Sequence, residues 1–399
     1  MSLRDVIIIG AGPSGLSAAI AARQRDLDYL VLEQGVLVNS IFRFPPQMVF
    51  FTTPELLEIG GLPFVSPFDK PTRTEALKYY RKVVDVHDLR IVYQEKVLSV
   101  EKEGSGGSGR LGGSGRSGGS SRSGGSSRSG GSSGSGGAGQ SSGSDGSDGD
   151  EVFAIESESA NGVRRVRHAR HVVMAIGYFD HPVTLGVPGE DLPHVHHYYG
   201  EPHPHYRQRV VIVGGGNSAA ESALEMFRAG AHVTIVHRAP TLKPTIKYWV
   251  RPDIENRIKE GSIAAHFGSV VREIRGTSIV IAPAGAPPPP TPADIAFPED
   301  GSKDFAAPVR PTLVGELEIP ADAVYLLTGY RADADLMKRA GVTLNARNAP
   351  VHDPVTFETN VSGLFVAGGA IAGVDTGTIF IENGRFHGEK IIDVINSRR

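Results

Sequence analysis

The chain has 399 residues, which suits two to three α/β domains and predicts at least two hydrophobic cores. Its formal net charge of −3 gives no basic field, so a nucleic acid or an anionic membrane has no electrostatic support as a partner. The sequence contains no cysteine, which excludes disulfides, thiolate metal ligands, iron-sulfur clusters and a Cys-x-x-Cys redox pair within this chain. No apolar run approaches the roughly 20 residues that span a bilayer, and the first residues show no signal-peptide pattern, so we expect a cytoplasmic protein.

The first elements in chain order are a strand, a glycine-rich turn, a helix and a second strand. Val6–Ile9 is an all-apolar run typical of a parallel strand buried on both faces; Ser14–Arg25 has helical spacing, and Tyr29–Leu32 is the next strand. The turn from Gly10 to Gly15 reads G-x-G-x-x-G, in which glycines permit a tight turn, close approach of a pyrophosphate and helix packing.

Glu33 follows the second strand, where a carboxylate can accept hydrogen bonds from both ribose hydroxyls. Glycine-rich turns also occur for purely steric reasons, but the spacing to Glu33 favours a bound dinucleotide.

Two later segments have loop composition. Residues 104–150 are almost entirely glycine and serine and predict a disordered insertion, which lengthens a turn between the neighbouring strands Arg90–Glu101 and Val152–Glu158. Residues 282–311 include four consecutive prolines and predict extended or coil-like chain instead of strand.

The strand, turn and helix pattern occurs a second time about 200 residues later. Val210–Val213, Ser218–Ala229 and His232–Val236 are the expected strand, helix and strand, and residues 214–219 between them have the G-x-G-x-x-A form. His237 and Arg238 stand where the first unit has Glu33, and Lys243 follows, so a ribose that carries a 2′-phosphate is favoured, as in NADP. The alternative for these cations is a solvated surface.

Two apolar runs end at glycines that suit a boundary between domains. Residues 172–178 include Ala175 and Gly177, and residues 324–330 include Gly329; at such glycines the backbone can pass close to a cofactor. A strand followed by an ordinary turn is the alternative.

Five histidines gather between His194 and His205, in a proline-rich stretch between the two units. They lack the i, i+4 helical spacing and the carboxylates of a typical metal site, so we expect no metal.

With both glycine-rich turns and both boundary strands, the chain resembles the two-dinucleotide-binding flavoproteins of the thioredoxin reductase type. Within that group, residues 39–41, 50–61 and 379–388 resemble the bacillithiol disulfide reductase family. The resemblance implies an α/β fold of two Rossmann-like three-layer domains, with an NADPH-binding domain (181–321) inserted in an FAD-binding domain (1–180 and 322–399). It also implies a homodimer and hydride transfer from NADPH to FAD, in which the protein orients the partners.

The resemblance also implies individual site residues, including backbone contact from Val97 to the adenine and a helix near Thr378 that points its N-terminus at the flavin. The predicted FAD site is Gly10, Gly12, Pro13, Ser14, Gly15, Glu33, Gln34, Asn39, Ser40, Ile41, Thr52, Val97, Ala175, Gly177, Gly368, Gly369, Thr378 and Ile379. The predicted NADP site is Gly214, Gly216, Asn217, Ser218, Ala219, His237, Arg238, Lys243 and Gly329.

The sequence departs from these families at three points. The redox cysteine pair of thioredoxin reductases is missing, and Ser14 occupies the position where bacillithiol reductases typically carry a cysteine, so no catalytic residue is assigned. Gly369 stands where many relatives have an aspartate. We expect the Ser14 hydroxyl to cap a free N–H at the start of its helix.

Four functions stay open on this evidence. The first is a reductase of a small disulfide that uses reduced flavin directly, and the second is a ferredoxin or flavodoxin reductase. The third is a flavin monooxygenase, because Gly177-Tyr178 and Gly329-Tyr330 resemble motifs of that group. The fourth is a nucleotide-binding redox sensor without turnover. The expected acceptor is therefore a small molecule or a small redox protein.

Overall fold

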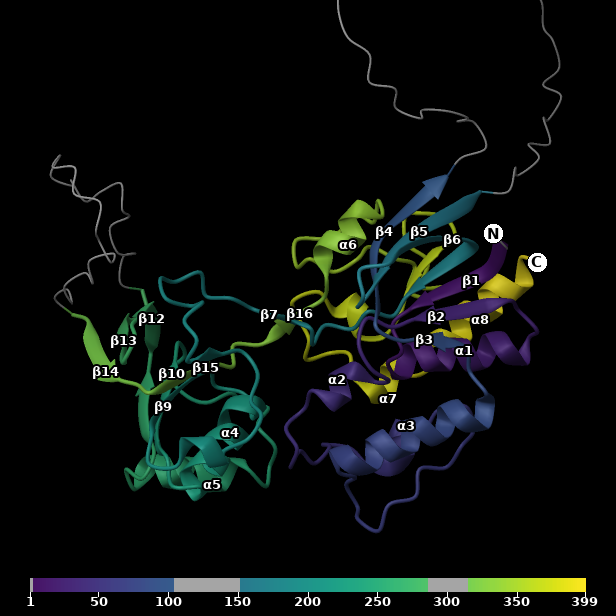
Figure 1. Ribbon diagram of the computed structural model, residues 1–399. Helices are drawn as coiled ribbons and strands as arrows, with labels where there is room; N and C mark the ends of the chain where they lie inside the picture. Colours follow the sequence, from purple (N-terminus) through teal and green to yellow (C-terminus); the bar gives the residue numbers. More distant parts are fainter. Residues whose placement is uncertain (1–2, 104–150, 286–314) are drawn as a thin grey trace, which may run out of the picture.

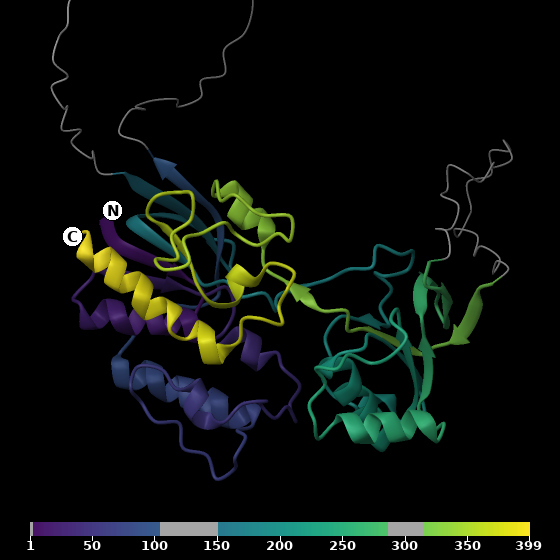
Figure 2. The same ribbon diagram turned by 180° about the vertical axis from the view of Figure 1, so that it is seen from behind.

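The computed structural model describes residues 3–103, 151–285 and 315–399, and they form two bodies side by side (Figures 1 and 2). The larger body contains both the N-terminal and the C-terminal segments, and the smaller body contains the middle of the chain. Among the described helices, none is both long and apolar enough to cross a membrane.

A seven-stranded sheet forms the centre of the first body, in the order β3-β2-β1-β6-β5-β4, with β17 paired to β6. The pairs among β1, β2, β3, β6 and β17 are parallel, whereas β5 pairs antiparallel with β4 and β6. The strands are β1 Leu3–Ile9, β2 Tyr29–Leu32, β3 Ile91–Val92, β4 Glu95–Glu103, β5 Val152–Ser159, β6 Arg164–Met174 and β17 Leu364–Val366.

Both faces of this sheet are covered at β1, which explains the apolar run in that strand. Val6 and Ile8 face one core with α1, α3 and α8, while Ile7 and Ile9 face the other core with α6 and strands β4 and β5. The helices are α1 Pro13–Gln24, α2 Asn39–Phe42, η1 Pro54–Leu57, α3 Arg73–His87, α6 Ala334–Arg339, η4 Gly368–Ala372, α7 Ile381–Gly384 and α8 His387–Ser397.

The second body contains a parallel five-stranded sheet in the order β11-β10-β9-β15-β8. Val210 and Ile212 pack against α4 and α5, and Val211 and Val213 pack against the three-stranded sheet β12-β13-β14. The elements are β8 Val195–His196, η2 His203–His205, β9 Arg209–Val213, α4 Asn217–Arg228, β10 His232–His237, α5 Arg251–Lys259, β11 Ala264–Phe267, β12 Ser269–Ile274, β13 Ser278–Pro283, β14 Leu317–Pro320 and β15 Ala323–Leu326.

A short two-stranded ribbon joins the bodies (Figure 1). Strand β7, His181–Pro182, leaves the first body and pairs antiparallel with β16, Tyr330–Arg331, which returns to it. The two segments that connect the bodies therefore lie next to each other, which is the geometry of a hinge.

The α/β class and the two strand-turn-helix units are confirmed, with element ends within a few residues of the prediction. Two details differ. Strand β13 extends to Pro283, two residues into the predicted coil, because it pairs with both β12 and β14. Strand β15 pairs with β9 in the second body although the sequence assigned it to the FAD-binding part, and the domain limits otherwise stay a prediction.

The insertion at 104–150 and most of the proline-rich segment lie outside the described residues. The strands that flank the insertion are neighbours as expected, since Glu103 pairs with Val152.

Candidate active site

The first glycine-rich turn joins β1 to α1, and two of its glycines are required by sterics. A Cβ on Gly10 would collide with the Ala175 carbonyl, and a Cβ on Gly15 would collide with the Gly10 carbonyl. Gly12, the residue before α1, has open space where a Cβ would stand. The start of α1, with its free N–H groups, is therefore accessible to an anion at Gly12.

Glu33 lies beside this turn at the end of β2. Its carboxylate accepts hydrogen bonds from the Ala11 N–H at 2.7 Å and the Gly35 N–H at 2.8 Å, and the residue is 5% exposed. Burial raises the pKa of Glu33, and the two N–H donors oppose that rise. The fixed carboxylate borders the cavity described next, where it can accept from a ribose diol.

A cavity opens at this turn, and its empty volume, with the open solvent at its mouth included, is about 1270 Å³. The predicted FAD residues that line it are Gly10, Gly12, Pro13, Ser14, Glu33, Gln34, Asn39, Ser40, Ile41, Val97, Ala175, Gly177, Gly369 and Ile379.

Four predicted FAD residues do not line the cavity. Gly15 packs behind the turn, and Thr52 is buried. Gly368 has a positive φ of 62° and lies against Ser14, and the Thr378 hydroxyl donates to the Asp375 carbonyl at 3.1 Å. The helix expected near Thr378 begins only at Ile381, because the Asn383 side chain bridges the Phe380 N–H and the Thr378 carbonyl.

Ser14 does not cap an N–H, contrary to expectation. Its hydroxyl donates to the carbonyl of Gly384 in α7 at 2.9 Å, and α1 has no side-chain cap. A Cβ on Gly368 would collide with the Ser14 hydroxyl. The residue at position 14 thus ties α1 to α7 at the edge of the cavity.

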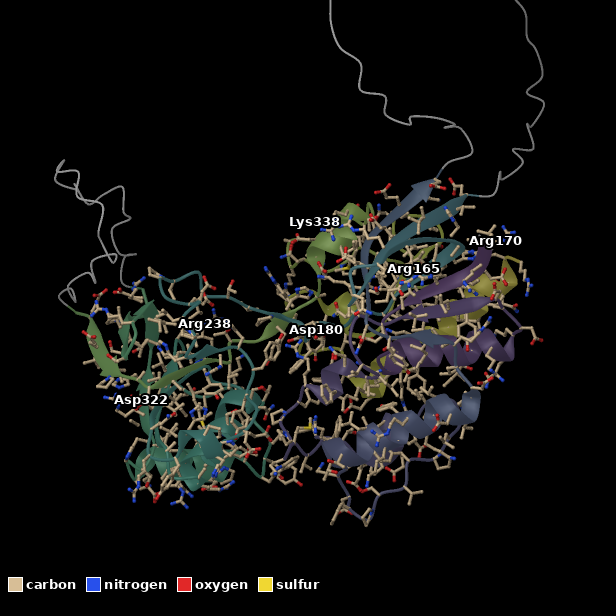
Figure 3. All side chains as sticks on the ribbon, in the orientation of Figure 1. Arg165, Arg170, Asp180, Arg238, Asp322 and Lys338 are labelled. Atoms are coloured by element: carbon tan, nitrogen blue, oxygen red, sulfur yellow. The ribbon has the colours of Figure 1, made fainter. Side chains whose placement is uncertain are left out.

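Asp180 is a cavity residue that the sequence did not reveal. Its carboxylate accepts from Gln34 at 2.9 Å, Asn39 at 3.2 Å and Arg43 at 2.7 Å, and it lies where the two bodies meet (Figure 3). The Arg43 guanidinium lies 4.1 Å from the ring centroid of Tyr198. No motif marks Asp180, because its partners are brought together only by the fold. The other cavity residues that the prediction missed include Phe44, Lys96, Tyr178, Phe179 and Phe380.

The second glycine-rich turn joins β9 to α4 and has similar sterics. A Cβ on Gly214 would meet the Leu327 carbonyl, whereas Gly216, the residue before α4, has only the Lys243 side chain within 4 Å. Ser218 and the buried Ala219 lie in the first turn of α4. The Asn217 side chain points toward the loop between β10 and α5, where it accepts a hydrogen bond from the Lys247 N–H at 2.8 Å.

The cations predicted for a 2′-phosphate differ in exposure. Arg238 and Lys243 are exposed, and Arg238 lies on the second body (Figure 3). His237 is buried, with its ring where a Cβ on Gly215 would stand, and burial lowers its pKa with help from Lys243 and Arg238. In this structure, burial therefore favours the neutral form of the His237 ring. Gly329 has a φ of 111° just before the connecting ribbon.

The histidine-rich stretch makes contacts within the second body. His205 hydrogen-bonds Gln208 at 2.9 Å and Tyr325 at 2.7 Å, and His196 packs on the Tyr325 ring. Among the residues that the structure describes, no group of three metal-ligating side chains converges.

Comparison with known proteins agrees with this architecture. Residues 7–108 and 148–284 match the family described as pyridine nucleotide-disulphide oxidoreductase. The chain is 34% identical to bacilliredoxin reductase Bdr of Bacillus subtilis (strain 168), over 100% of this chain and 99% of that protein. The structure of bacillithiol disulfide reductase Bdr from Bacillus cereus matches with a TM-score of 0.78 and 32% identity, over 100% of both chains.

A ferredoxin-NADP reductase of Ignicoccus hospitalis is 23% identical, over 92% of this chain and 90% of that protein. The predicted family resemblance and the two-dinucleotide fold are thus confirmed. The family implies FAD and NAD(P)H as cofactors, and the glycine-rich turns and the cavity fit such groups. The chain therefore belongs to the pyridine nucleotide-disulphide oxidoreductase family, as a flavin-dependent enzyme similar to the bacillithiol disulfide reductases but without a cysteine.

Proposed function

We propose that the protein is an NADPH-dependent FAD oxidoreductase that reduces a small disulfide directly from reduced flavin. The observation that carries the proposal is the cavity at the first glycine-rich turn, which both Gly12 and Glu33 line. In this proposal residues 1–180 and 322–399 bind FAD and residues 181–321 bind NADPH, with β15 completing the second sheet.

The residues of the first body would bind and orient FAD. The N–H groups at the start of α1 bind the pyrophosphate, and Glu33 accepts from the ribose hydroxyls. Asn39, Ser40 and Ile379, which also line the cavity, would contact the flavin ring. Bound FAD would supply two-electron redox chemistry with NADPH as hydride donor, and no protein acid or base is needed for that transfer.

The residues of the second body would select NADPH over NADH. Gly216 leaves room for the pyrophosphate at the start of α4. Arg238 and Lys243 are exposed and form no ion pair with another residue in the described ranges, so both can bind a 2′-phosphate. Strand β10 ends at His237 and Arg238 follows it, so no carboxylate stands where Glu33 stands in the first unit.

The acceptor is proposed from the family resemblance and the missing thiols. A small disulfide takes two electrons and two protons and leaves as two thiols. Because the chain has no cysteine, no mixed disulfide with the protein forms, and the electrons pass directly from the flavin. A ferredoxin or flavodoxin reductase is the second candidate, since that reaction also needs no protein thiol.

Acceptor assays on Ser14 variants test the proposal. With NADPH, the wild type should reduce bacillithiol disulfide, and Ser14→Cys should reduce it faster by about tenfold, since a thiol there adds a covalent route. Ser14→Ala is the control and should gain nothing. Turnover with ferredoxin or flavodoxin alone would favour the second candidate, and a hydroxylated product with oxygen would favour a monooxygenase. The homodimer and the cytoplasmic location stay predictions, and light scattering tests the first.

A further inference from the structure

Lys247 is a buried lysine at the contact between the two bodies. Its ammonium donates to the Val49 carbonyl of the first body at 2.9 Å and to Glu221 of the second body at 2.6 Å. The residue is only 5% exposed. A lysine is rarely buried so fully, because burial of its charge is costly unless it is paired. The ion pair with Glu221 and the hydrogen bond to the Val49 carbonyl together offset the cost of burying this charge.

Aromatic contacts lie beside Lys247. The ring of Trp249 stacks on Phe51 with 5.9 Å between centroids and an angle of 26°. Lys70 of the first body donates to the Phe51 carbonyl at 2.6 Å and lies 4.9 Å from the Trp249 ring centroid. We call Val49, Phe51, Lys70, Lys247 and Trp249 the latch, because they join the two bodies away from the ribbon.

The latch belongs to the same loop as the proposed NADPH ligands. The loop between β10 and α5, residues 238–250, begins with Arg238 and contains Lys243. The Lys243 N–H donates to the Gly215 carbonyl at 2.8 Å, and the Asn217 amide bonds both the Lys247 N–H and the Thr245 carbonyl. The second glycine-rich turn thus holds the loop directly before the latch.

We propose that Lys247 is a positioning residue that couples nucleotide binding at the second glycine-rich turn to the orientation of the second body on the first. The proposal rests on the proposed function. A 2′-phosphate drawn to Arg238 and Lys243 shifts the loop, withdraws Lys247 and Trp249 from Val49 and Phe51, and lets the second body turn about the ribbon. Across the two bodies, the latch has one hydrogen bond from Lys247, one stacked ring pair and one cation–π contact from Lys70, so a bound ligand can outweigh it.

Trp249 is the single tryptophan of the chain, so intrinsic fluorescence reports on the latch. We would measure acrylamide quenching of the FAD-loaded protein as wild type, Lys247→Met and Phe51→Ala. Quenching should rise by about twofold in both variants, because Trp249 is only 36% exposed in this structure and local opening exposes more of its indole. Lys259→Met is the matched control, since this lysine is exposed at the end of α5 in the same body, and its quenching should equal that of the wild type. Phe51 is 56% exposed, so its variant keeps the test decisive if Lys247→Met fails to fold.

NADP⁺, which binds without turnover, provides the second arm. It should raise quenching in the wild type to the level of Lys247→Met and add nothing in that variant, and NAD⁺ should have the smaller effect. If both variants showed the same quenching as the wild type, the latch contacts would not hold Trp249 against the first body, and the proposal would be wrong. NADP⁺ that binds by calorimetry but leaves wild-type quenching unchanged would overturn the coupling. Failure of NADP⁺ to bind would contradict the proposed function and the coupling, and the variants without nucleotide would still decide whether the latch exists.

Discussion

His387 holds the backbone next to the cavity at the first glycine-rich turn, through an unprotonated ring nitrogen. Its Nδ1 accepts the Gly368 N–H at 3.1 Å, and a backbone N–H can only donate, so the ring must be neutral at Nδ1. The ring is 8% exposed and stacks on Phe357 at 4.3 Å. Burial lowers the pKa of His387 to about 4, with a smaller contribution from Lys390.

Protonation of His387 should therefore destabilise the fold. Its pKa is lower in the folded state than the usual 6.5, so the unfolded chain binds the proton more tightly and stability falls as the pH drops from 6.5 to about 4. The loss reaches about 3 kcal/mol at the low end, measured by chemical unfolding. In His387→Asn, whose amide oxygen can also accept from Gly368, this part of the pH dependence should vanish. An unchanged pH profile in the variant would contradict the assignment.

Arg238 should decide the choice of nucleotide. Arg238→Ala should raise KM for NADPH by about tenfold or more, since it removes a charge-assisted hydrogen bond to phosphate, and leave KM for NADH nearly unchanged. Arg228→Ala is the control, because that arginine of the same body pairs with Asp253. Equal effects of Arg238→Ala on both nucleotides would show that the 2′-phosphate binds elsewhere.

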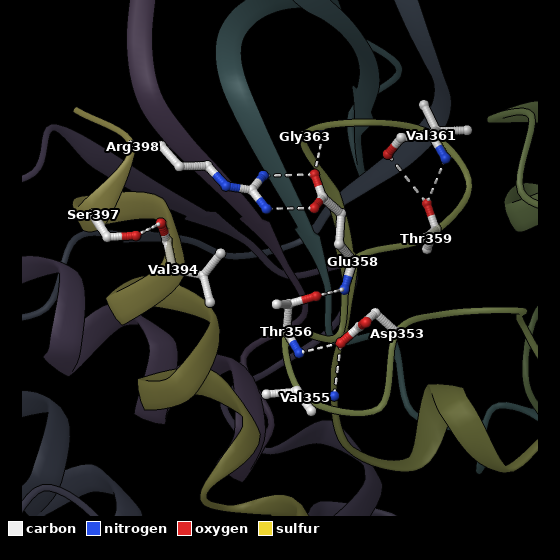
Figure 4. Close-up of polar contacts among 10 residues, drawn as sticks. All are labelled: Asp353, Val355, Thr356, Glu358, Thr359, Val361, Gly363, Val394, Ser397 and Arg398. Carbon is white, nitrogen blue, oxygen red and sulfur yellow. Dashed lines mark hydrogen bonds and ion pairs between the residues drawn. The ribbon is translucent and has the colours of Figure 1, made fainter.

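At the scale of elements, an ion pair anchors the C-terminal helix α8 (Figure 4). Arg398 follows α8 and donates to both carboxylate oxygens of Glu358, at 2.8 and 2.6 Å, and Glu358 also accepts the Gly363 N–H at 2.8 Å. Arg398 lowers the pKa of Glu358, although burial opposes the shift. The pair holds α8 against the segment that leads into β17 and the Gly368-Gly369 turn.

Glu358→Gln should cost about 1 kcal/mol at pH 7, a modest value because the Arg398 side chain is 42% exposed. Since the folded-state pKa is lowered, the stabilisation is present above pH 4.5 and is lost as the pH falls through the folded-state value. The difference in unfolding free energy between wild type and variant should therefore become smaller as the pH is lowered below 4.5. Glu101→Gln, at an exposed carboxylate of β4, should change nothing; a cost equal to that of Glu358→Gln would contradict the anchor.

The sequence predicted the elements whose causes are local. The run Val6–Ile9 indicated a strand buried on both faces, and the glycine at 15 is needed because a Cβ there would collide with the Gly10 carbonyl of the same turn. The start of α7 was misplaced because the Asn383 side chain holds residues 378–380 out of the helix. Ser14 was misjudged because its partner, Gly384, is distant in sequence and near only in the fold.

At the scale of the whole molecule, the residues that escaped prediction join segments far apart in the chain. Asp180 gathers Gln34, Asn39 and Arg43, and Lys247 reaches Val49. These side chains have no motif, because their partners are distant in sequence and near only in the fold. Sequence patterns identified two nucleotide-binding units, and only the assembled structure showed the contacts between them.

The proposed function depends on electron transfer between two nucleotides, one bound by each body. The most direct measurement is the visible absorbance of the FAD-loaded protein under argon, before and after addition of NADPH, with NADH as the comparison. We predict rapid loss of the flavin absorbance with NADPH and a much slower loss with NADH. A protein that binds no FAD, or whose bound FAD stays oxidised with NADPH, would contradict the account.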